Sequence, residues 1–299
     1  MNEKKGLFYV VLAQIIWGIM PVYWKYTTFV NSFALIAHRI LGSFVFMVLL
    51  LVVIRQWKTF AANFRDAKTQ LRYSLPGAIM VMLNWSIYVY AIQKGEILQT
   101  TLGYYICPLL LAFIGWTFFG EKPRTAQYVA VVLSTIGVIL QTIAIGKVPY
   151  YAFAVALTFA VYSAIKKKTP YDSIFSMGYE TLFLLPVALI TLGLARTGGW
   201  ELTQSVSRST YMILFIAGPM TVLPLLLHAH GIRSVPLSVS AFIQYLSPTM
   251  AMTLGILVYG EAFDTNRLIA FSFSWAALIL FALDQWRHLR TLPKELDVE

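Results

Sequence analysis

The sequence predicts an all-α membrane protein in which ten transmembrane helices form two inverted five-helix repeats. Hydrophobic residues make up 59% of the 299 residues and charged residues 12%, with a mean hydropathy of +0.70, and a soluble core needs less apolar surface. The chain also repeats itself after 140 residues, since Tyr105, Pro108, Gly115, Gly120 and Glu121 recur as Tyr245, Pro248, Gly255, Gly260 and Glu261. About five spans, an odd number, separate the copies. The second half is therefore expected to enter the membrane in the opposite sense, which is typical of secondary transporters.

Ten apolar segments of roughly 20 residues, the length that crosses a hydrocarbon core, can be marked along the chain. In the first half they are residues 6–26, 34–54, 73–93, 98–119 and 126–144. In the second half they are residues 149–165, 174–195, 211–230, 235–259 and 266–286. We expect the two repeats to occupy residues 1–145 and 146–299.

The first and sixth segments need individual justification. The first is too long and too rich in aromatic residues for a cleaved signal peptide, and no small-residue cleavage site follows it. The sixth is short, but fusing it with the fifth would require about 40 apolar residues without a turn, and Gly146 and Pro149 favour a break.

The longest polar connection, residues 55–72, is too short to fold alone. Functional residues are therefore expected within the bundle or at its mouths.

The basic residues predict the orientation, because Lys and Arg are retained on the cytoplasmic side. With the N-terminus inside, the inner segments hold 16 of the 23 basic residues, the outer segments hold 5, and Lys25 and Arg39 lie within spans. Both termini are therefore expected in the cytoplasm. The net charge of +10 is spread over short inner loops, which favours attraction to the anionic lipids of the bilayer over nucleic-acid binding.

No motif of a catalytic or metal-binding site occurs. The sequence lacks HExxH, CxxC, GxSxG and the Walker-type GxxxxGK[ST]. Cys107 is the only cysteine, and the four histidines are scattered. We expect no metal, no cofactor and no enzymatic activity, and ATP-driven pumping by this chain alone is not indicated.

Four ionisable residues within the predicted spans are candidates for the substrate or proton pathway: Lys25, His38, Arg39 and Glu180. The bilayer makes such groups costly unless they face the bundle interior, water or a partner. Aligning the repeats at an offset near 142 places His38 opposite Glu180, a base and an acid at equivalent depths, and Lys25 opposite Lys167. Two structural interpretations remain open, because Lys25 can snorkel to the interface and Arg39 can form a structural pair with Glu180.

The fourth and ninth spans carry the clearer repeat and are expected to line the pathway. Pro108 and Pro248 each free a backbone carbonyl one turn earlier and kink a helix, so both are predicted hinges. The side chains expected to line a central cavity are Trp17, Tyr105, Gln244 and Tyr245.

Small residues in the same two spans are typical of close helix packing. Gly115 and Gly255 are interpreted in this way, and such stripes also leave a homodimer open. Glu121 and Glu261 close the two repeats, and we interpret each as a structural tie to a neighbouring loop.

Several runs of residues resemble a known family. They are WGIMPVYWK (17–25), HR (38–39), GEILQTTLGYYICPLL (95–110), FGEK (119–122), YETLFLLP (179–186), QYLSPT (244–249) and YGEAF (259–263). In this order, over nearly the whole chain, they resemble the RarD family of EamA-type transporters in the drug/metabolite transporter superfamily. The resemblance implies a ten-helix inverted-repeat bundle in the bacterial inner membrane with cytoplasmic ends. It also implies export of small metabolites or drugs, RarD itself being labelled a chloramphenicol-sensitivity protein. Cys107 departs from the family pattern, where asparagine is expected.

Residues and resemblance together predict a permease that moves a small organic solute outward by alternating access, coupled to protons. Glu180 is the expected titrating group, with Arg39 as its counter-charge. Two other classes stay open: a membrane-embedded enzyme, against which stands the lack of a clustered catalytic constellation, and a regulatory subunit without transport. The identity of the solute is left open, because the sequence does not determine how the helices rotate.

Overall fold

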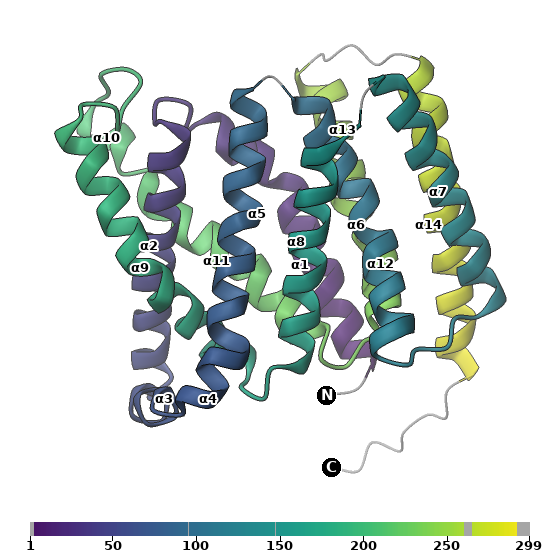
Figure 1. Ribbon diagram of the computed structural model, residues 1–299, viewed down its shortest axis with the longest axis horizontal. Helices are drawn as coiled ribbons and strands as arrows, with labels where there is room; N and C mark the ends of the chain where they lie inside the picture. The colour runs from purple at the N-terminus through teal and green to yellow at the C-terminus, as the bar shows by residue number, and fades with distance from the viewer. Residues whose placement is uncertain (1–2, 95, 147, 260–264, 292–299) are drawn as a thin grey trace.

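The computed structural model describes residues 3–94, 96–146, 148–259 and 265–291, and every regular element in these ranges is a helix (Figure 1). The long helices are α1 (Glu3–Lys25), α2 (Ser32–Val53), α5 (Leu75–Gln93), α6 (Ile97–Phe118), α7 (Thr125–Ile145), α8 (Tyr150–Lys168), α9 (Ser173–Thr197), α11 (Leu214–Gly231), α13 (Leu246–Tyr259) and α14 (Thr265–Thr291). The short elements are α3 (Trp57–Phe64), α4 (Ala67–Thr69), the π-helix η1 (Gln70–Ser74), α10 (Arg208–Tyr211) and α12 (Leu237–Ile243). The all-α prediction is confirmed.

Seven helical segments of the described chain are long and apolar enough to cross a membrane, so the protein is a multi-pass membrane protein. They are Glu3–Lys25, Ser32–Val53, Ala67–Ala91, Thr125–Ile143, Ser173–Thr197, Arg208–Gly231 and Leu237–Val258. A shorter apolar stretch, Leu102–Phe118, lies in α6. Helices α8 and α14 coincide with the sixth and tenth predicted segments. The count of ten crossings stays a prediction.

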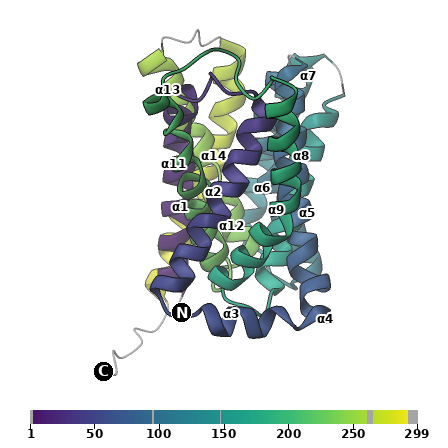
Figure 2. The ribbon, with the colours of Figure 1, turned by 90° about the vertical axis from the view of Figure 1, so that its left-hand side faces the viewer.

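The long helices stand side by side in one bundle (Figures 1 and 2). Helix α6 runs from the top of Figure 1 toward the end where the N-terminus lies, whereas α12 and α13 run the opposite way. Helix α3 lies across the end of the bundle near the N-terminus (Figure 2).

The predicted polar connection at 55–72 is largely helical, which corrects the boundary of the third span. Helix α3 packs on α9, where the rings of Phe60 and Tyr179 stack with centroids 4.4 Å apart. The Tyr179 hydroxyl also donates to the Phe60 carbonyl at 2.9 Å. The third span begins at Ala67 rather than at residue 73, because the helix continues through η1 into α5.

The two predicted hinge prolines lie in different surroundings. The ninth predicted span is divided, since α12 ends at Ile243 and α13 begins at Leu246. Pro248 has no N–H, so the Gln244 carbonyl one turn earlier lacks its usual helical partner, which explains the break. Pro108 lies within the uninterrupted helix α6. Motion at either proline stays a prediction.

Close crossings in the bundle depend on glycine, as expected where backbones approach. At the crossing of α2 and α11, a Cβ on Gly218 would overlap the backbone of Gly42. At the crossing of α1 and α11, a Cβ on Gly231 would lie 2.7 Å from the Gly6 carbonyl oxygen. Helix α11 therefore contacts α1 and α2 backbone to backbone.

Candidate functional site

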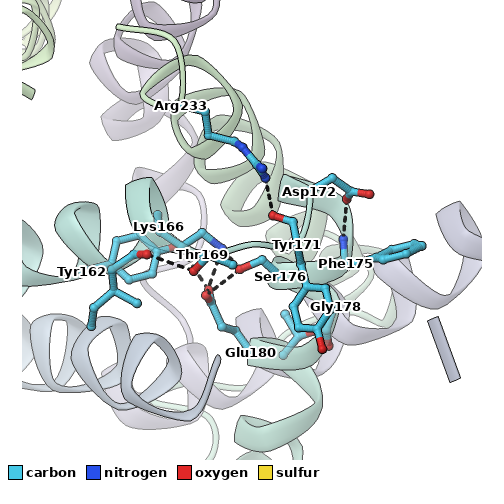
Figure 3. A network of polar contacts seen from close by, with 12 residues as sticks. Tyr162, Lys166, Thr169, Tyr171, Asp172, Phe175, Ser176, Gly178, Glu180 and Arg233 are labelled. Atoms are coloured by element: carbon cyan, nitrogen blue, oxygen red, sulfur yellow. Dashed lines mark hydrogen bonds and ion pairs between the residues drawn. The ribbon is translucent and has the colours of Figure 1, made fainter. Parts of the chain in front are cut away.

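An ion pair between Lys166 and Glu180 is buried between α8 and α9 (Figure 3). The Lys166 Nζ lies 2.9 Å from Glu180 Oε1 and donates to Ser176 Oγ at 2.6 Å. The Tyr162 hydroxyl donates to the other carboxylate oxygen at 3.2 Å. Both charged side chains are only 1% exposed. The four side chains point toward one another and form one polar cluster inside an apolar bundle.

Helical spacing on both sides of a short connection brings these groups together. Lys166 lies in the last turn of α8, and Ser176 and Glu180 lie one turn apart on α9. Helix α9 begins after Asp172, whose carboxylate accepts a hydrogen bond from the Phe175 N–H at 2.9 Å. This cap fixes the start of α9, and with it the position of Glu180 relative to the end of α8.

A third helix, α5, packs against the ion pair. A Cβ on Gly77 would lie 2.8 Å from Glu180 Oε1, so only glycine leaves room for the carboxylate. Burial of two charges is costly, and their attraction compensates only when the geometry is good and further hydrogen bonds are made; the hydroxyls of Tyr162 and Ser176 make them. The arrangement holds an acid and a base together in the interior of the bundle.

The partner of Glu180 is not the predicted one. Arg39 was expected as its counter-charge, and this is wrong, because Lys166 occupies that place. The sequence placed Lys166 in a loop after residue 165, but α8 continues to Lys168 and Lys166 is 2% exposed. One signal in the sequence could have indicated a buried lysine. Successive residues of a helix point about 100° apart, so three consecutive lysines cannot all face the membrane surface.

Arg39 lies among α1, α2, α5 and α11. Its guanidinium carbon is 4.6 Å from the ring centroids of both Trp24 and Trp85. Its Nε donates to the Thr221 hydroxyl at 3.0 Å. None of the ion pairs found in the described chain includes Arg39. It is a cation held by aromatic rings and one hydroxyl.

His38 pairs with Glu201, and its predicted equivalence to Glu180 in the repeat stays a prediction. Its Nε2 lies 2.8 Å from Glu201, which also accepts hydrogen bonds from Tyr211 at 2.5 Å and Arg196 at 3.0 Å. Burial raises the pKa of Glu201, but the hydrogen bonds from these neighbours outweigh burial and hold its pKa below the usual 4.5. Lys25 is exposed as the last residue of α1, in keeping with the snorkelling interpretation. His38 therefore belongs to a different ion-pair group from Lys166 and Glu180.

Trp17 packs beside a histidine that sequence reasoning did not select. Its ring centroid lies 5.5 Å from that of His228 and 5.8 Å from that of Phe159. The Nε2 of His228 is 3.1 Å from Ser163 Oγ, while its Nδ1 is buried without a hydrogen-bond partner among the described residues. No pattern in the sequence distinguishes His228, because only packing brings it next to Trp17.

The equivalent tyrosines of the two repeats touch. The rings of Tyr105 and Tyr245 are stacked with centroids 5.8 Å apart, and the Tyr245 hydroxyl donates to the Tyr105 carbonyl at 3.1 Å. Both are 1% exposed, and Gln244 is 8% exposed. In this conformation the three lie in packed surroundings, and their lining of a solute pathway stays a prediction.

Glu121 holds the start of α12. Its carboxylate accepts hydrogen bonds from the Leu237 N–H at 2.6 Å, the Ser238 N–H at 2.9 Å and the Ser238 hydroxyl at 2.7 Å. The carboxylate also lies directly against Gly115, where no side chain would fit. This contact agrees with the structural interpretation of Glu121. Its repeat equivalent, Glu261, lies outside the described residues.

Comparison with known proteins identifies the family. The model of the EamA-like transporter family matches residues 4–143 and again residues 147–283. The chain belongs to the EamA-like transporter family. This EamA protein is 37% identical over 286 residues to the uncharacterized transporter YojE of Bacillus subtilis, with 95% of each chain covered. It is 35% identical to Protein RarD of Salmonella typhimurium, with 95% of this chain and 96% of that one covered.

A solved crystal structure supports the fold of the EamA protein. It aligns with a TM-score of 0.71 at 16% identity and covers 93% of this chain and 97% of that chain. The family and the relatives make the EamA protein a membrane transporter, and the resemblance to RarD proteins is confirmed. These names indicate a transporter rather than an enzyme.

Proposed function

We propose that this EamA protein is a secondary transporter that moves a small metabolite or drug outward across the bacterial inner membrane by alternating access. The two repeats, residues 1–145 and 146–299, provide ten transmembrane helices in two opposite orientations. Both termini lie in the cytoplasm, where the basic loops are retained.

The contact between Tyr105 and Tyr245 is the observation that carries this proposal. The two residues are equivalent in the repeat, and residues related by a two-fold axis meet only near that axis. Their contact therefore supports an axis through the middle of the bundle. The opposite directions of α6 and of α12 and α13 in Figure 1 favour an axis in the membrane plane. Alternating access exchanges the conformations of two repeats about such an axis.

Glu180 is the group that binds the coupling proton in this proposal, with Lys166 in place of Arg39 as its counter-charge. In the present conformation the two charges neutralise each other without solvent. When α8 and α9 separate, a lone carboxylate in the bundle interior is costly. Protonation removes that cost, so opening of the cluster takes up a proton and closing releases it.

Export is tested by untargeted metabolite profiling of the medium from overproducing cells. The parent is compared with the double variant Lys166→Met/Glu180→Gln, because Glu180→Gln alone would leave the Lys166 ammonium buried without compensation. We expect specific solutes to accumulate outside with the parent and not with the double variant. Glu201→Gln, which changes an acid outside the cluster, is the matched control and should export like the parent.

The coupling is tested with the exported solute in proteoliposomes. A pH gradient should accelerate transport by the parent and leave the double variant unaffected. In the metabolite profiling, a medium with the same solutes as that of cells without the protein would contradict export. If the pH gradient does not change the rate of transport by the parent, proton coupling is contradicted, but transport itself is not.

A further inference from the structure

Arg39 carries a charge inside the bundle that no described residue neutralises. Glu180 is already paired with Lys166, and Glu201 with His38 and Arg196. Arg39 itself takes part in no ion pair within the described ranges. An unpaired cation among transmembrane helices is costly and is usually matched by a counter-ion or water. A bound anion would supply such a counter-ion.

The guanidinium of Arg39 is held in place by neighbours that leave its outer donors free. Trp24 and Trp85 each lie 4.6 Å from the guanidinium carbon, and such cation–π contacts favour a cation removed from water. Thr221 accepts the Nε hydrogen bond at 3.0 Å. The two Nη groups keep their donors in one plane, the geometry that binds a carboxylate through two parallel hydrogen bonds.

The Arg39 side chain is only partly buried. No described residue accepts a hydrogen bond from the Nη atoms, and these atoms are nevertheless not sealed from solvent. Tyr104 of α6 is 45% exposed although its ring lies 6.1 Å from that of Tyr88 on α5. Both phenols lie within electrostatic reach of Arg39. Side chains from α2, α5 and α6 therefore lie near one another around a charged group that is only partly buried.

We propose that Arg39 binds the carboxylate of a small aromatic or apolar monoanion, and that the solute of this transporter is therefore an organic acid. The inference rests on the proposed transport function. A single cation balances a single negative charge, which disfavours multiply charged phosphates. The half-exposed phenol of Tyr104 and the indole edges that the guanidinium leaves uncovered provide apolar surface for an aromatic or apolar body.

Binding is tested on the purified full-length protein in detergent with three probes of nearly equal shape: phenylacetate, phenylacetamide and phenethylamine. Tryptophan fluorescence reports binding, because Trp24 and Trp85 flank the site. We expect saturable binding of phenylacetate, at least tenfold tighter than that of the neutral amide, and no binding of the amine. Equal affinity for acid and amide, or no saturable binding of the acid, would overturn the proposal.

Variants assign the preference to Arg39. Arg39→Gln should bring the affinity for phenylacetate down to that for phenylacetamide, whereas Arg208→Gln, which removes an exposed arginine of α10, should keep the tenfold preference. If Arg39→Gln does not fold, Thr221→Val provides the test, because it removes only the acceptor of the Nε hydrogen bond. It should weaken phenylacetate binding several-fold and leave the amide unchanged. A preference that survives these changes would place anion binding elsewhere and overturn the assignment.

The outcome also separates the solute class from the transport function. If metabolite profiling finds exported solutes that are neutral or cationic, the organic-acid inference is wrong and transport stands. If phenylacetate binds through Arg39 but no solute is exported in any condition, the binding site stands and the proposal of outward transport is wrong.

Discussion

At the scale of single residues, the cluster around Glu180 combines two opposing effects. Two charges have lost their water, and in return Lys166 and Glu180 lie 2.9 Å apart with hydroxyls on both sides. Such pairs contribute little net stability compared with apolar side chains, but breaking one leaves a buried charge. The pair is therefore better suited to defining a state of the bundle than to stabilising it.

This argument predicts a strong coupling between the two substitutions. Lys166→Met and Glu180→Gln should each lower the free energy of unfolding by about 3–5 kcal/mol, because each leaves a charge buried alone. The double variant should recover most of that loss. Thermal unfolding in detergent measures all four proteins. A double variant as unstable as the sum of the single ones would mean that the two side chains do not interact.

Glu201 predicts a dependence of stability on pH. Burial raises its pKa, but hydrogen bonds from Tyr211, Arg196 and His38 prevail and keep the pKa below 4.5. A group whose pKa is lowered on folding stabilises the folded state above its unfolded pKa, and this contribution is lost as the pH falls through the folded pKa. The parent should therefore melt at a higher temperature than Glu201→Gln at pH 7, and the difference should shrink as the pH falls below 4.5. A difference that does not change with pH would contradict this account.

The residues of the candidate site were only partly predictable. Glu180 could be selected from the sequence because an acid in an apolar helix needs a partner. The run of three lysines indicates that one of them can turn inward, but it does not identify Lys166 as the partner, since pairing depends on how α8 and α9 rotate about their axes and such a run also suits an interfacial anchor. The same rotations place Arg39 beside Trp24 and Trp85.

At the scale of elements, helix α11 depends on glycines where it crosses its neighbours. Gly218 meets the backbone of Gly42 on α2, so even one methyl group forces the two helices apart. Close contact of this kind is a main source of attraction between helices in lipid, where the hydrophobic effect does not act between them.

Gly218→Ala should accordingly lower the free energy of unfolding by about 1–3 kcal/mol, the usual cost of overpacking a tight contact. The matched control is Gly193→Ala on α9, where a Cβ would meet nothing within 4 Å. This control should be neutral or stabilising by about 0.5–1 kcal/mol, because alanine favours a helix. Thermal unfolding in detergent compares them, and equal effects of the two substitutions would rule out the crossing as the cause.

Helix positions followed from apolar length, whereas the exceptions followed from tertiary contacts. Pro248 predicted a kink near the break before α13, because proline has no backbone N–H to donate. Helix α3 was not foreseen, because its segment is polar and its order comes from the stacking of Phe60 on Tyr179. Local propensity cannot report a contact made with a helix more than a hundred residues away.

At the scale of the whole molecule, different segments lie at the two ends of the bundle. Helix α3 lies across the end near the N-terminus, and the segment between α9 and α10 lies at the other end (Figure 1). The excess of lysine and arginine predicts that the first end is cytoplasmic. The internal repeat could be found from the sequence alone, but the meeting of Tyr105 with Tyr245 required the packed bundle.

Cysteine labelling tests this orientation. Cys107 is the only cysteine in the chain and is buried, so Cys107→Ala gives a clean background. In intact cells a membrane-impermeant maleimide should label Ser205→Cys, in the segment between α9 and α10, and leave Lys58→Cys on α3 unlabelled. Inverted vesicles should show the opposite pattern. Labelling of both positions from one side would contradict the predicted topology.

The hydrogen bonds between Glu121 and the start of α12 connect the two halves of the chain. A residue near the end of the first half caps a helix of the second, so part of the information for assembly resides in non-covalent contacts rather than in the peptide bond that joins them. Separately translated fragments of residues 1–146 and 147–299 should therefore find each other in the membrane and copurify. Glu121→Ala should weaken this complementation, and Lys122→Ala, at the next position, should not. Fragments that assemble equally well without the carboxylate would show that helix packing alone directs their pairing.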